Sequence, residues 1–334
     1  MSPRVSILLP VYDAAATLSA CLRSIARQRL GDYECVAVDD GSRDASGELL
    51  RRAAAHDSRI RILSRPHLGL VPSLEAGVHA CRGRYVARMD ADDWMHRERL
   101  AAQTAVLDAD PRLDAVGCHV RIFPRQTLGQ GMRNYETWLA SIDSARRVRE
   151  EAFVECPIAH PTWMIRRETL ASFGYRDRGW PEDYDLLLRL LTAGRGVGVV
   201  PRRLLGWRNR PGRLSRVDSR YGIDRFTACK AEHLASGFLA GSPHYALWGY
   251  GATGRTLRRA LACHGKTPSA ILELHPGRLG NRIHGAPVLR PADWLETADT
   301  PLVVSVAGAE ARGRIRGELR RTRWVECRDY VCAA

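Results

Sequence analysis

The chain has 334 residues, of which 45% are hydrophobic and 26% charged, and its formal net charge is +14. This composition excludes a mainly disordered or fibrous chain, and the length suits two α/β domains. Almost all of the basic residues are arginines spread along the sequence, and no recognised nucleic-acid-binding module accompanies them. We therefore predict a globular protein with a buried core that does not bind nucleic acid.

The cysteines and the N-terminal segment indicate the cellular compartment in which the protein is expected. Nine cysteines show no CxxC pair and no zinc-like spacing, which is typical of free thiols in a reducing compartment. Residues 1–11 lack the basic start and long apolar stretch of a secretory signal, and no segment approaches the roughly 20 apolar residues of a membrane span. We expect a cytoplasmic protein. Its basic charge leaves open a peripheral contact at the inner face of the membrane.

Strands and helices alternate along the first ninety residues. Strands are predicted at 5–11, 33–38, 60–63 and 85–89, and helices at 18–25, 45–55 and 70–81. Such alternation predicts a mostly parallel, doubly wound sheet. Ligands bind such sheets at the carboxyl ends of the strands, so polar residues at strand ends are the first candidates for a site.

Two predicted strand ends are acidic. Asp39-Asp40-Gly41-Ser42 follows the second strand, and Ser42 is expected to cap the next helix. Asp90-Ala91-Asp92-Asp93 follows the fourth strand, and its three carboxylates repel one another unless a cation or several donors neutralise them. A hard divalent cation held by oxygen ligands, Mg²⁺ or Mn²⁺, is the economical explanation.

The strand-end motifs, in this order and spacing, resemble the family 2 glycosyltransferases of the GT-A fold. The segments that carry the resemblance are 5–13, 39–44 and 90–93, and it extends over roughly residues 3–220. It implies that Pro10, Tyr12 and Asp40 hold the nucleoside of the donor. It further implies that Asp90 and Asp92 form an Asp-x-Asp element, with Asp90 on the ribose and Asp92 on the metal.

A third acidic segment, Trp180 to Asp185, opens a predicted helix with a leucine-rich face. Acidic residues are favoured in the first turn of any helix, which by itself would explain them. The segment also resembles the Glu-Asp motif of the family, which implies that Asp183 is the general base, with Glu182 beside it. We assign Asp185 to structure.

The sugar and acceptor pocket is expected upstream of this helix and at its start. Residues 160–167 resemble the family segment that lies under the pocket, which implies roles for His160 and Thr162, and Trp180 is added from the acidic segment. A lone histidine is more often structural than catalytic, so His160 is a secondary candidate.

The arginine-rich segment 207–215 is similar to a family loop that closes over the diphosphate. The resemblance implies donor binding by Arg208, Arg210, Arg213 and Ser215, and arginine forks suit phosphate oxygens. Arg210 stands where the family usually has a histidine, which puts a metal-adjacent role of that position in doubt. A solvated arginine loop is the alternative.

A second glycine-rich pattern lies near the C-terminus. Residues 244–248 predict a strand that enters GxGxxG, formed by Gly249, Gly251 and Gly254, with Glu273 about 20 residues on. This unit of about ninety residues resembles the nucleotide-binding N-terminal domain of bacterial sugar acyltransferases. The alternative is a packing or dimerisation domain with a vestigial glycine loop.

The predicted fold class is therefore α/β. A GT-A type nucleotide-diphospho-sugar transferase domain is placed at 1–225, a helical linker at 226–241 and a smaller Rossmann-like α/β domain at 242–334. The resemblance implies a metal-dependent, inverting transfer from a nucleotide-diphosphate sugar, with UDP implied, to a hydroxyl group. A glycan or lipid-linked acceptor in bacterial surface-glycan or glycoconjugate synthesis is expected.

Three other functions share some of these features. A catalytically silent nucleotide-sugar sensor is the main alternative, but a sensor has no need of the base Asp183. A sugar nucleotidyltransferase would need a glycine-rich, basic loop after the first strand, and residues 10–15 are neither. An oxidoreductase based on the glycine loop would leave residues 1–220 unexplained. The donor sugar, the acceptor and the oligomeric state, including a homo-oligomer, stay open.

Overall fold

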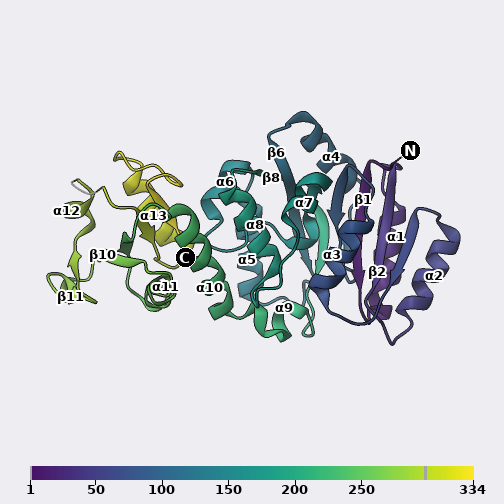
Figure 1. Ribbon diagram of the computed structural model, residues 1–334, viewed down its shortest axis with the longest axis horizontal. Helices are drawn as coiled ribbons and strands as arrows, with labels where there is room; N and C mark the ends of the chain where they lie inside the picture. The colour runs from purple at the N-terminus through teal and green to yellow at the C-terminus, as the bar shows by residue number, and fades with distance from the viewer. Residues whose placement is uncertain (1, 297–298) are drawn as a thin grey trace. The chain divides into compact units, whose positions relative to one another are not determined.

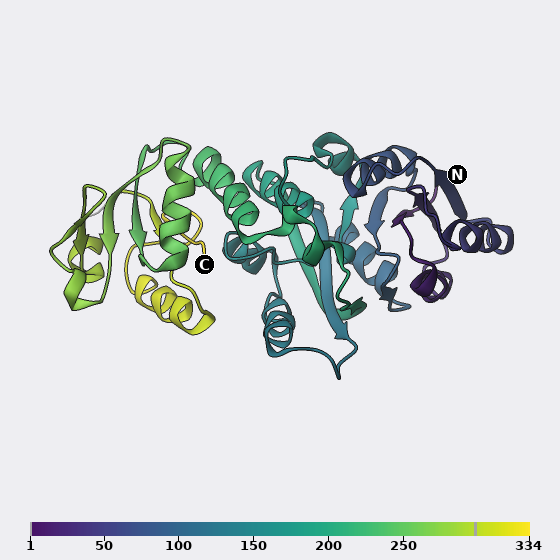
Figure 2. The ribbon, with the colours of Figure 1, turned by 90° about the horizontal axis from the view of Figure 1, so that it is seen from below.

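The computed structural model describes residues 2–296 and 299–334, and the chain separates into two compact units (Figures 1 and 2). The N-terminal unit consists of Met1–Val148, Pro157–Arg178 and Ala193–Val217. The C-terminal unit consists of Arg149–Cys156, Gly179–Thr192 and Asp218–Ala334. The helix predicted to carry the Glu-Asp motif therefore belongs to the C-terminal unit.

An eight-stranded sheet forms the centre of the N-terminal unit. Its strands are β1 (Val5–Val11), β2 (Tyr33–Asp39), β3 (Ile60–Ser64), β4 (Tyr85–Arg88), β5 (Trp94–Met95), β6 (Leu113–Phe123), β7 (Met164–Arg166) and β8 (Gly196–Arg208). Their order is β3-β2-β1-β4-β7-β6-β8-β5. Strands β1 to β4 are parallel as predicted, whereas β7 and β5 pair antiparallel with their neighbours. The sheet is mixed rather than uniformly parallel.

Helices cover both faces of this sheet. They are α1 (Ala15–Ala26), α2 (Ser46–His56), α3 (Leu70–Ala80), α4 (Arg99–Ala109), α5 (Gln130–Ala140), α7 (Arg167–Phe173) and α9 (Leu214–Val217), with a 3₁₀ turn, η1, at His160–Thr162. Helix α6 (Ala145–Glu151) begins in this unit. Every residue of β1 is buried. Ile7 and Leu9 pack in the core with α1, whereas Leu8 lies against Gly77 of α3 on the other face. Burial on both faces explains why the strand is a continuous apolar run.

The C-terminal unit contains the second, smaller sheet. Its strands are β9 (His244–Trp248), β10 (Thr267–Leu272), β11 (Arg282–Ile283), β12 (Ala286–Leu289), β13 (Leu302–Val304) and β14 (Tyr330–Cys332). The order is β11-β12-β10-β9-β13-β14, and only the β11–β12 pair is antiparallel among the described strands of this sheet. The prediction of an α/β fold with a second, smaller α/β sheet is confirmed.

The helices of the C-terminal unit include the residues predicted as a linker. They are α8 (Glu182–Thr192), α10 (Ile223–His233), α11 (Ala252–Ala262), α12 (Pro291–Leu295) and α13 (Ala309–Leu319), with short turns η2 (Ser219–Tyr221), η3 (Leu234–Phe238) and η4 (Pro276–Arg278). Within the described ranges, no helix is long and apolar enough to cross a bilayer. All nine cysteines are free thiols, as predicted.

The glycine loop between β9 and α11 is closed by tight backbone packing. Gly249 has a φ of +93°, which favours glycine. A Cβ atom on Gly254 would collide with the carbonyl oxygen of Gly249 and lie 2.7 Å from Ser305 Oγ. Ser305 Oγ already donates to that carbonyl over 2.7 Å. Gly254 is therefore needed for the close approach of α11 to the loop.

We expect Gly254→Ala to destabilise the C-terminal unit by about 1–3 kcal/mol, the usual cost of overpacking. Urea unfolding would measure the change. Gly251→Ala is the matched control, because a Cβ there meets no described atom within 4 Å. Equal losses in both variants would show that the packing around Gly254 is not the cause.

Candidate active site

Two predicted nucleoside contacts meet at neighbouring strand ends of the N-terminal unit. Pro10 is buried in β1, and Tyr12 follows the strand with 41% of its surface exposed. Asp40 follows β2, and its backbone N–H donates to Val11 O over 2.9 Å. The parallel register pairs Val11 with Asp39, which brings Tyr12 and Asp40 to the same edge of the sheet.

His67 completes this group, although none of the predicted motifs contains it. Its ring stacks on Tyr12 with centroids 3.9 Å apart, and its Nδ1 lies 2.8 Å from Asp40 Oδ2. The Asp40 carboxylate also accepts from the backbone N–H groups of Leu68 and Gly69, at 3.1 and 2.9 Å. His67 lies three residues beyond the end of β3, so the rule that ligands bind at strand ends could have identified it. The result is an aromatic and polar platform at the ends of β1, β2 and β3.

Asp90, Asp92 and Asp93 follow β4 and form an acidic cluster, with one carboxylate oxygen of each within 4.8 Å of the others. Asp90 forms an ion pair with buried Arg88. Asp93 is buried, and its Oδ1 accepts from the backbone N–H of Arg208 over 2.7 Å. Burial, followed by the charges of Asp90 and Asp92, raises the pKa of Asp93 well above its usual value.

The residues of the acidic cluster fit a hard divalent cation. Asp93 Oδ2 is buried and has no hydrogen-bond partner in the described part of the chain. The donors are all carboxylate oxygens, which Mg²⁺ and Mn²⁺ prefer. A cation here would also offset the repulsion that raises the pKa of Asp93.

The arginine loop, residues 209–213 between β8 and α9, also reaches the acidic cluster. Arg208 Nε donates to the backbone oxygen of Asp92 over 2.7 Å, and Arg210 Nε donates to Asp92 Oδ2 over 2.9 Å. The guanidinium of Arg213 lies 4.2 Å from the centre of the Trp207 ring instead. The side chain of Ser215, which is in α9, lies outside the described residues. Arginine nitrogens thus already neutralise part of the acidic cluster.

His160 and Thr162 lie in η1 and are buried within the N-terminal unit. His160 Nε2 is 3.0 Å from the hydroxyl of Tyr175, and its ring meets Trp163 edge-on. Thr162 Oγ1 donates to Ala159 O over 2.7 Å. Both side chains are thus bonded inside the N-terminal unit, where η1 contacts β4 and β6, and a role in the sugar pocket stays a prediction.

Helix α8 of the C-terminal unit begins with Glu182 and Asp183. Glu182 is buried, and its Oε2 accepts from the Tyr221 hydroxyl over 2.7 Å. Burial and the nearby Glu182 and Asp183 carboxylates raise the pKa of Tyr221, which keeps its hydroxyl a donor. Asp183 is only partly buried, and its Oδ1 accepts from the backbone N–H of Tyr184 over 2.8 Å. Of the two carboxylates, Asp183 is the more accessible.

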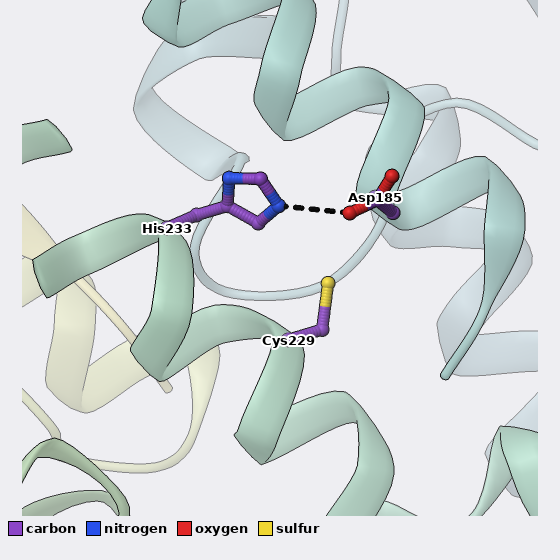
Figure 3. Close-up of side chains that lie close together, drawn as sticks. All are labelled: Asp185, Cys229 and His233. Carbon is purple, nitrogen blue, oxygen red and sulfur yellow. Dashed lines mark hydrogen bonds and ion pairs between the residues drawn. The ribbon is translucent and has the colours of Figure 1, made fainter. Parts of the chain in front are cut away.

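Asp185, also in the first turn of α8, lies close to Cys229 and His233 of α10 (Figure 3). Asp185 Oδ1 accepts from His233 Nε2 over 3.1 Å and from Trp180 Nε1 over 3.3 Å, and Oδ2 accepts from Arg189 Nε over 2.7 Å. Burial alone would raise the pKa of Asp185, but the bonds from His233 and Arg189 outweigh it and lower that pKa. This buried ion-pair network joins α10 to α8, as expected of a structural Asp185.

Comparison with known proteins identifies the family of the chain. The model of the family described as "Glycosyl transferase family 2" matches residues 6–174, which is half of the chain. The chain belongs to glycosyltransferase family 2. This glycosyltransferase is 28% identical over 265 residues to the uncharacterized glycosyltransferase EpsJ of Bacillus subtilis (strain 168), covering 75% of this chain and 72% of that protein. It is 30% identical over 254 residues to the O-antigen biosynthesis protein RfbC of Myxococcus xanthus, covering 70% of this chain and 18% of RfbC.

Solved structures show the same fold as this family 2 glycosyltransferase. Residues 1–349 of S. aureus TarS, in complex with UDP-GlcNAc, match with a TM-score of 0.57 at 15% identity, covering 79% of this chain and 72% of that one. The mannosyltransferase PcManGT from Pyrobaculum calidifontis, in complex with GDP-Man and Mn²⁺, matches with a TM-score of 0.52 at 20% identity. That match covers 79% of this chain and 70% of PcManGT. The GT-A fold predicted from the sequence is confirmed.

In the C-terminal unit of the glycosyltransferase, Arg278 links the glycine loop to Glu273. Arg278 Nη1 donates to Glu273 Oε2 over 2.8 Å and to the backbone oxygen of Tyr250 over 3.3 Å. Glu273, the acidic residue of the predicted nucleotide-binding pattern, is thus paired with an arginine. Nucleotide binding by Gly249, Gly251 and Gly254 stays a prediction.

The ion-pair network around Asp185 predicts a pH-dependent stability. Asp185→Asn should lower the free energy of unfolding at pH 7 by about 2–3 kcal/mol, since it leaves Arg189 without its counter-charge and weakens the hydrogen bond to His233. Because the pKa of Asp185 is lowered in the folded state, its contribution is present above its ordinary pKa of 3.8 and is lost as the pH falls through the folded value.

The measurement is urea unfolding at several pH values. The difference between wild type and variant should shrink below about pH 4. Glu310→Gln is the control, because it removes another Arg–carboxylate pair at i,i+4 in the same unit, but one that is exposed. If the difference in unfolding free energy between wild type and Asp185→Asn stayed constant down to about pH 2, the charge of Asp185 would not be the source of the stability.

Proposed function

We propose that this chain is an inverting glycosyltransferase that moves a sugar from a nucleotide-diphosphate sugar to an acceptor hydroxyl. The observation that carries the proposal is the acidic cluster at the end of β4, with the arginine loop beside it and a buried Asp93 Oδ2 that has no hydrogen-bond partner among the described residues. Carboxylates and guanidinium groups together suit a cation and a diphosphate. Metal dependence, with Mg²⁺ or Mn²⁺ held by Asp92, is part of the proposal.

The donor nucleotide is proposed to lie along the strand ends. Tyr12 and His67 offer ring faces for the base, and Asp40 orders the loop that carries His67. Asp90 is proposed to contact the ribose. UDP is favoured by the resemblance of the motifs and by the UDP-GlcNAc complex of TarS, whereas PcManGT binds GDP-Man, so guanosine donors remain to be tested.

The diphosphate is proposed to meet the arginine loop and Arg208 at the end of β8. Arg208, Arg210 and Arg213 carry permanent charges whose N–H groups can stabilise the oxygens of the leaving nucleotide. A divalent cation, when bound, would supply further positive charge against the same oxygens. Ser215 is proposed to add a hydroxyl donor.

Asp183 is proposed as the general base. Its carboxylate accepts the proton of the acceptor hydroxyl while that oxygen attacks the anomeric carbon from the side opposite the nucleotide. A single displacement of this kind inverts the anomeric configuration. Glu182, held by Tyr221, is proposed to keep the start of α8 in place, and His160, Thr162 and Trp180 to border the sugar and acceptor pocket.

The biological setting is proposed from the relatives. RfbC is named for O-antigen biosynthesis, which favours a glycan or lipid-linked acceptor in bacterial surface-glycan synthesis.

We further propose a cytoplasmic enzyme that could contact the inner face of the membrane, and a domain organisation of 1–225, 226–241 and 242–334. The C-terminal unit is proposed as a Rossmann-like nucleotide-binding domain like that of sugar acyltransferases.

The test is nucleotide release from a panel of UDP-, GDP- and dTDP-sugars with Mn²⁺ or Mg²⁺. Slow hydrolysis of one donor, abolished by a chelator, is the expected result, and it would name the sugar for an acceptor search. If no donor released its nucleotide and nucleotide binding did not depend on metal, the proposal of an enzyme would be overturned, and a nucleotide-sugar sensor would be favoured.

A further inference from the structure

Arg210 pairs with the carboxylate that is proposed to hold the cation. Its Nε donates to Asp92 Oδ2 over 2.9 Å. By the resemblance described above, a histidine is usual at this position. A neutral histidine can bind a metal, whereas a guanidinium is always charged and cannot. Asp92 is therefore neutralised in this structure by a cationic side chain of the protein itself.

Among the described residues, the arginines that contact the acidic cluster include Arg88, Arg208 and Arg210, and Arg210 is the least anchored of these three. The side chain of Arg88 is only 5% exposed. Arg208 is at the end of β8, and its backbone N–H is bonded to Asp93. The side chain of Arg210 is 49% exposed and lies in the arginine loop. Exposed ion pairs contribute little to stability, so Arg210 can leave Asp92 at small cost.

We propose that Arg210 competes with the divalent cation for Asp92. Without donor, Arg210 pairs with Asp92; with donor, it moves to the diphosphate oxygens, which its planar N–H fork suits, and Asp92 becomes free for the cation. This inference rests on the proposed function.

The competition makes cation and nucleotide binding cooperative. A divalent cation and a guanidinium repel each other when they share one carboxylate, so the free cation binds weakly to the donor-free protein. A nucleotide diphosphate that draws Arg210 away removes this repulsion. By linkage, the cation strengthens nucleotide binding by the same factor. The enzyme without donor therefore binds the divalent cation only weakly.

The experiment measures Mn²⁺ binding by electron paramagnetic resonance on the full chain, without nucleotide and with UDP or GDP. Arg210→Ala should lower the Kd for Mn²⁺ alone about tenfold, because it removes both the pairing and the repulsion. The ratio of Mn²⁺ affinities with and without nucleotide should shrink in this variant. Arg202→Ala is the matched control, since Arg202 is another exposed arginine, on β8, and pairs with Glu98. Circular dichroism would verify folding.

Three results would overturn the proposal. The first is a Kd for Mn²⁺ alone that changes by less than about twofold in Arg210→Ala. The second is an equal gain in Arg202→Ala, which would reveal a general effect of charge. The third is a gain that persists in Arg210→Ala/Asp92→Ala. Failure of the proposed function is distinguishable, because donor hydrolysis would be absent while the Mn²⁺ affinity still rose in Arg210→Ala.

Discussion

Asp183→Asn should lower kcat by about 10²- to 10⁴-fold, the usual contribution of a general base. The amide cannot accept the proton of the acceptor hydroxyl at neutral pH. Its oxygen can still accept the bond from the backbone N–H of Tyr184, so the start of α8 should keep its structure. The KM for the donor should change little, since the base contacts the acceptor rather than the nucleotide. Steady-state kinetics with the donor identified in the panel would measure both.

The control for this variant is Asp224→Asn, which neutralises an exposed aspartate in the first turn of α10 in the same unit. It should leave kcat unchanged. A kcat of Asp183→Asn within about threefold of wild type would exclude Asp183 as the base. Glu182 would then be the next candidate, although it is buried and bonded to Tyr221.

Asp92→Ala should remove metal-supported nucleotide binding. In the presence of Mn²⁺, the Kd for the nucleotide should rise by about tenfold or more, to the value that wild type shows with chelator. Without metal, the variant should bind the nucleotide at least as tightly as wild type, because the base platform of Tyr12 and His67 is untouched and Arg210 no longer pairs with residue 92. Isothermal titration calorimetry with UDP and GDP, with and without Mn²⁺, would measure four nucleotide affinities for each protein.

Asp32→Ala is the control for Asp92→Ala, since it removes an exposed carboxylate of the same unit outside the acidic cluster. Asp32→Ala should leave the nucleotide affinity unchanged, both with and without Mn²⁺. Retention of the Mn²⁺ effect in Asp92→Ala would show that the cation is held elsewhere, and the metal assignment would have to be abandoned.

The sequence by itself determined the family, the fold class and most of the strands and helices. These features are local: apolar runs, helical spacing and turn residues lie within a few positions of one another, and β1, β2 and α3 follow them closely. The acidic strand ends at Asp40 and Asp90 could be found for the same reason, since parallel strands present their ends at one edge.

The tertiary structure alone decided which distant side chains meet. His67 stacks on Tyr12 across 55 positions, as the residue numbers give, and Arg210 reaches Asp92 across 118 positions. It also decided that β5 and β7 run antiparallel and that α8 packs with α10 in the C-terminal unit. Such pairings depend on how strands and helices pack across the whole unit, so no local pattern encodes them.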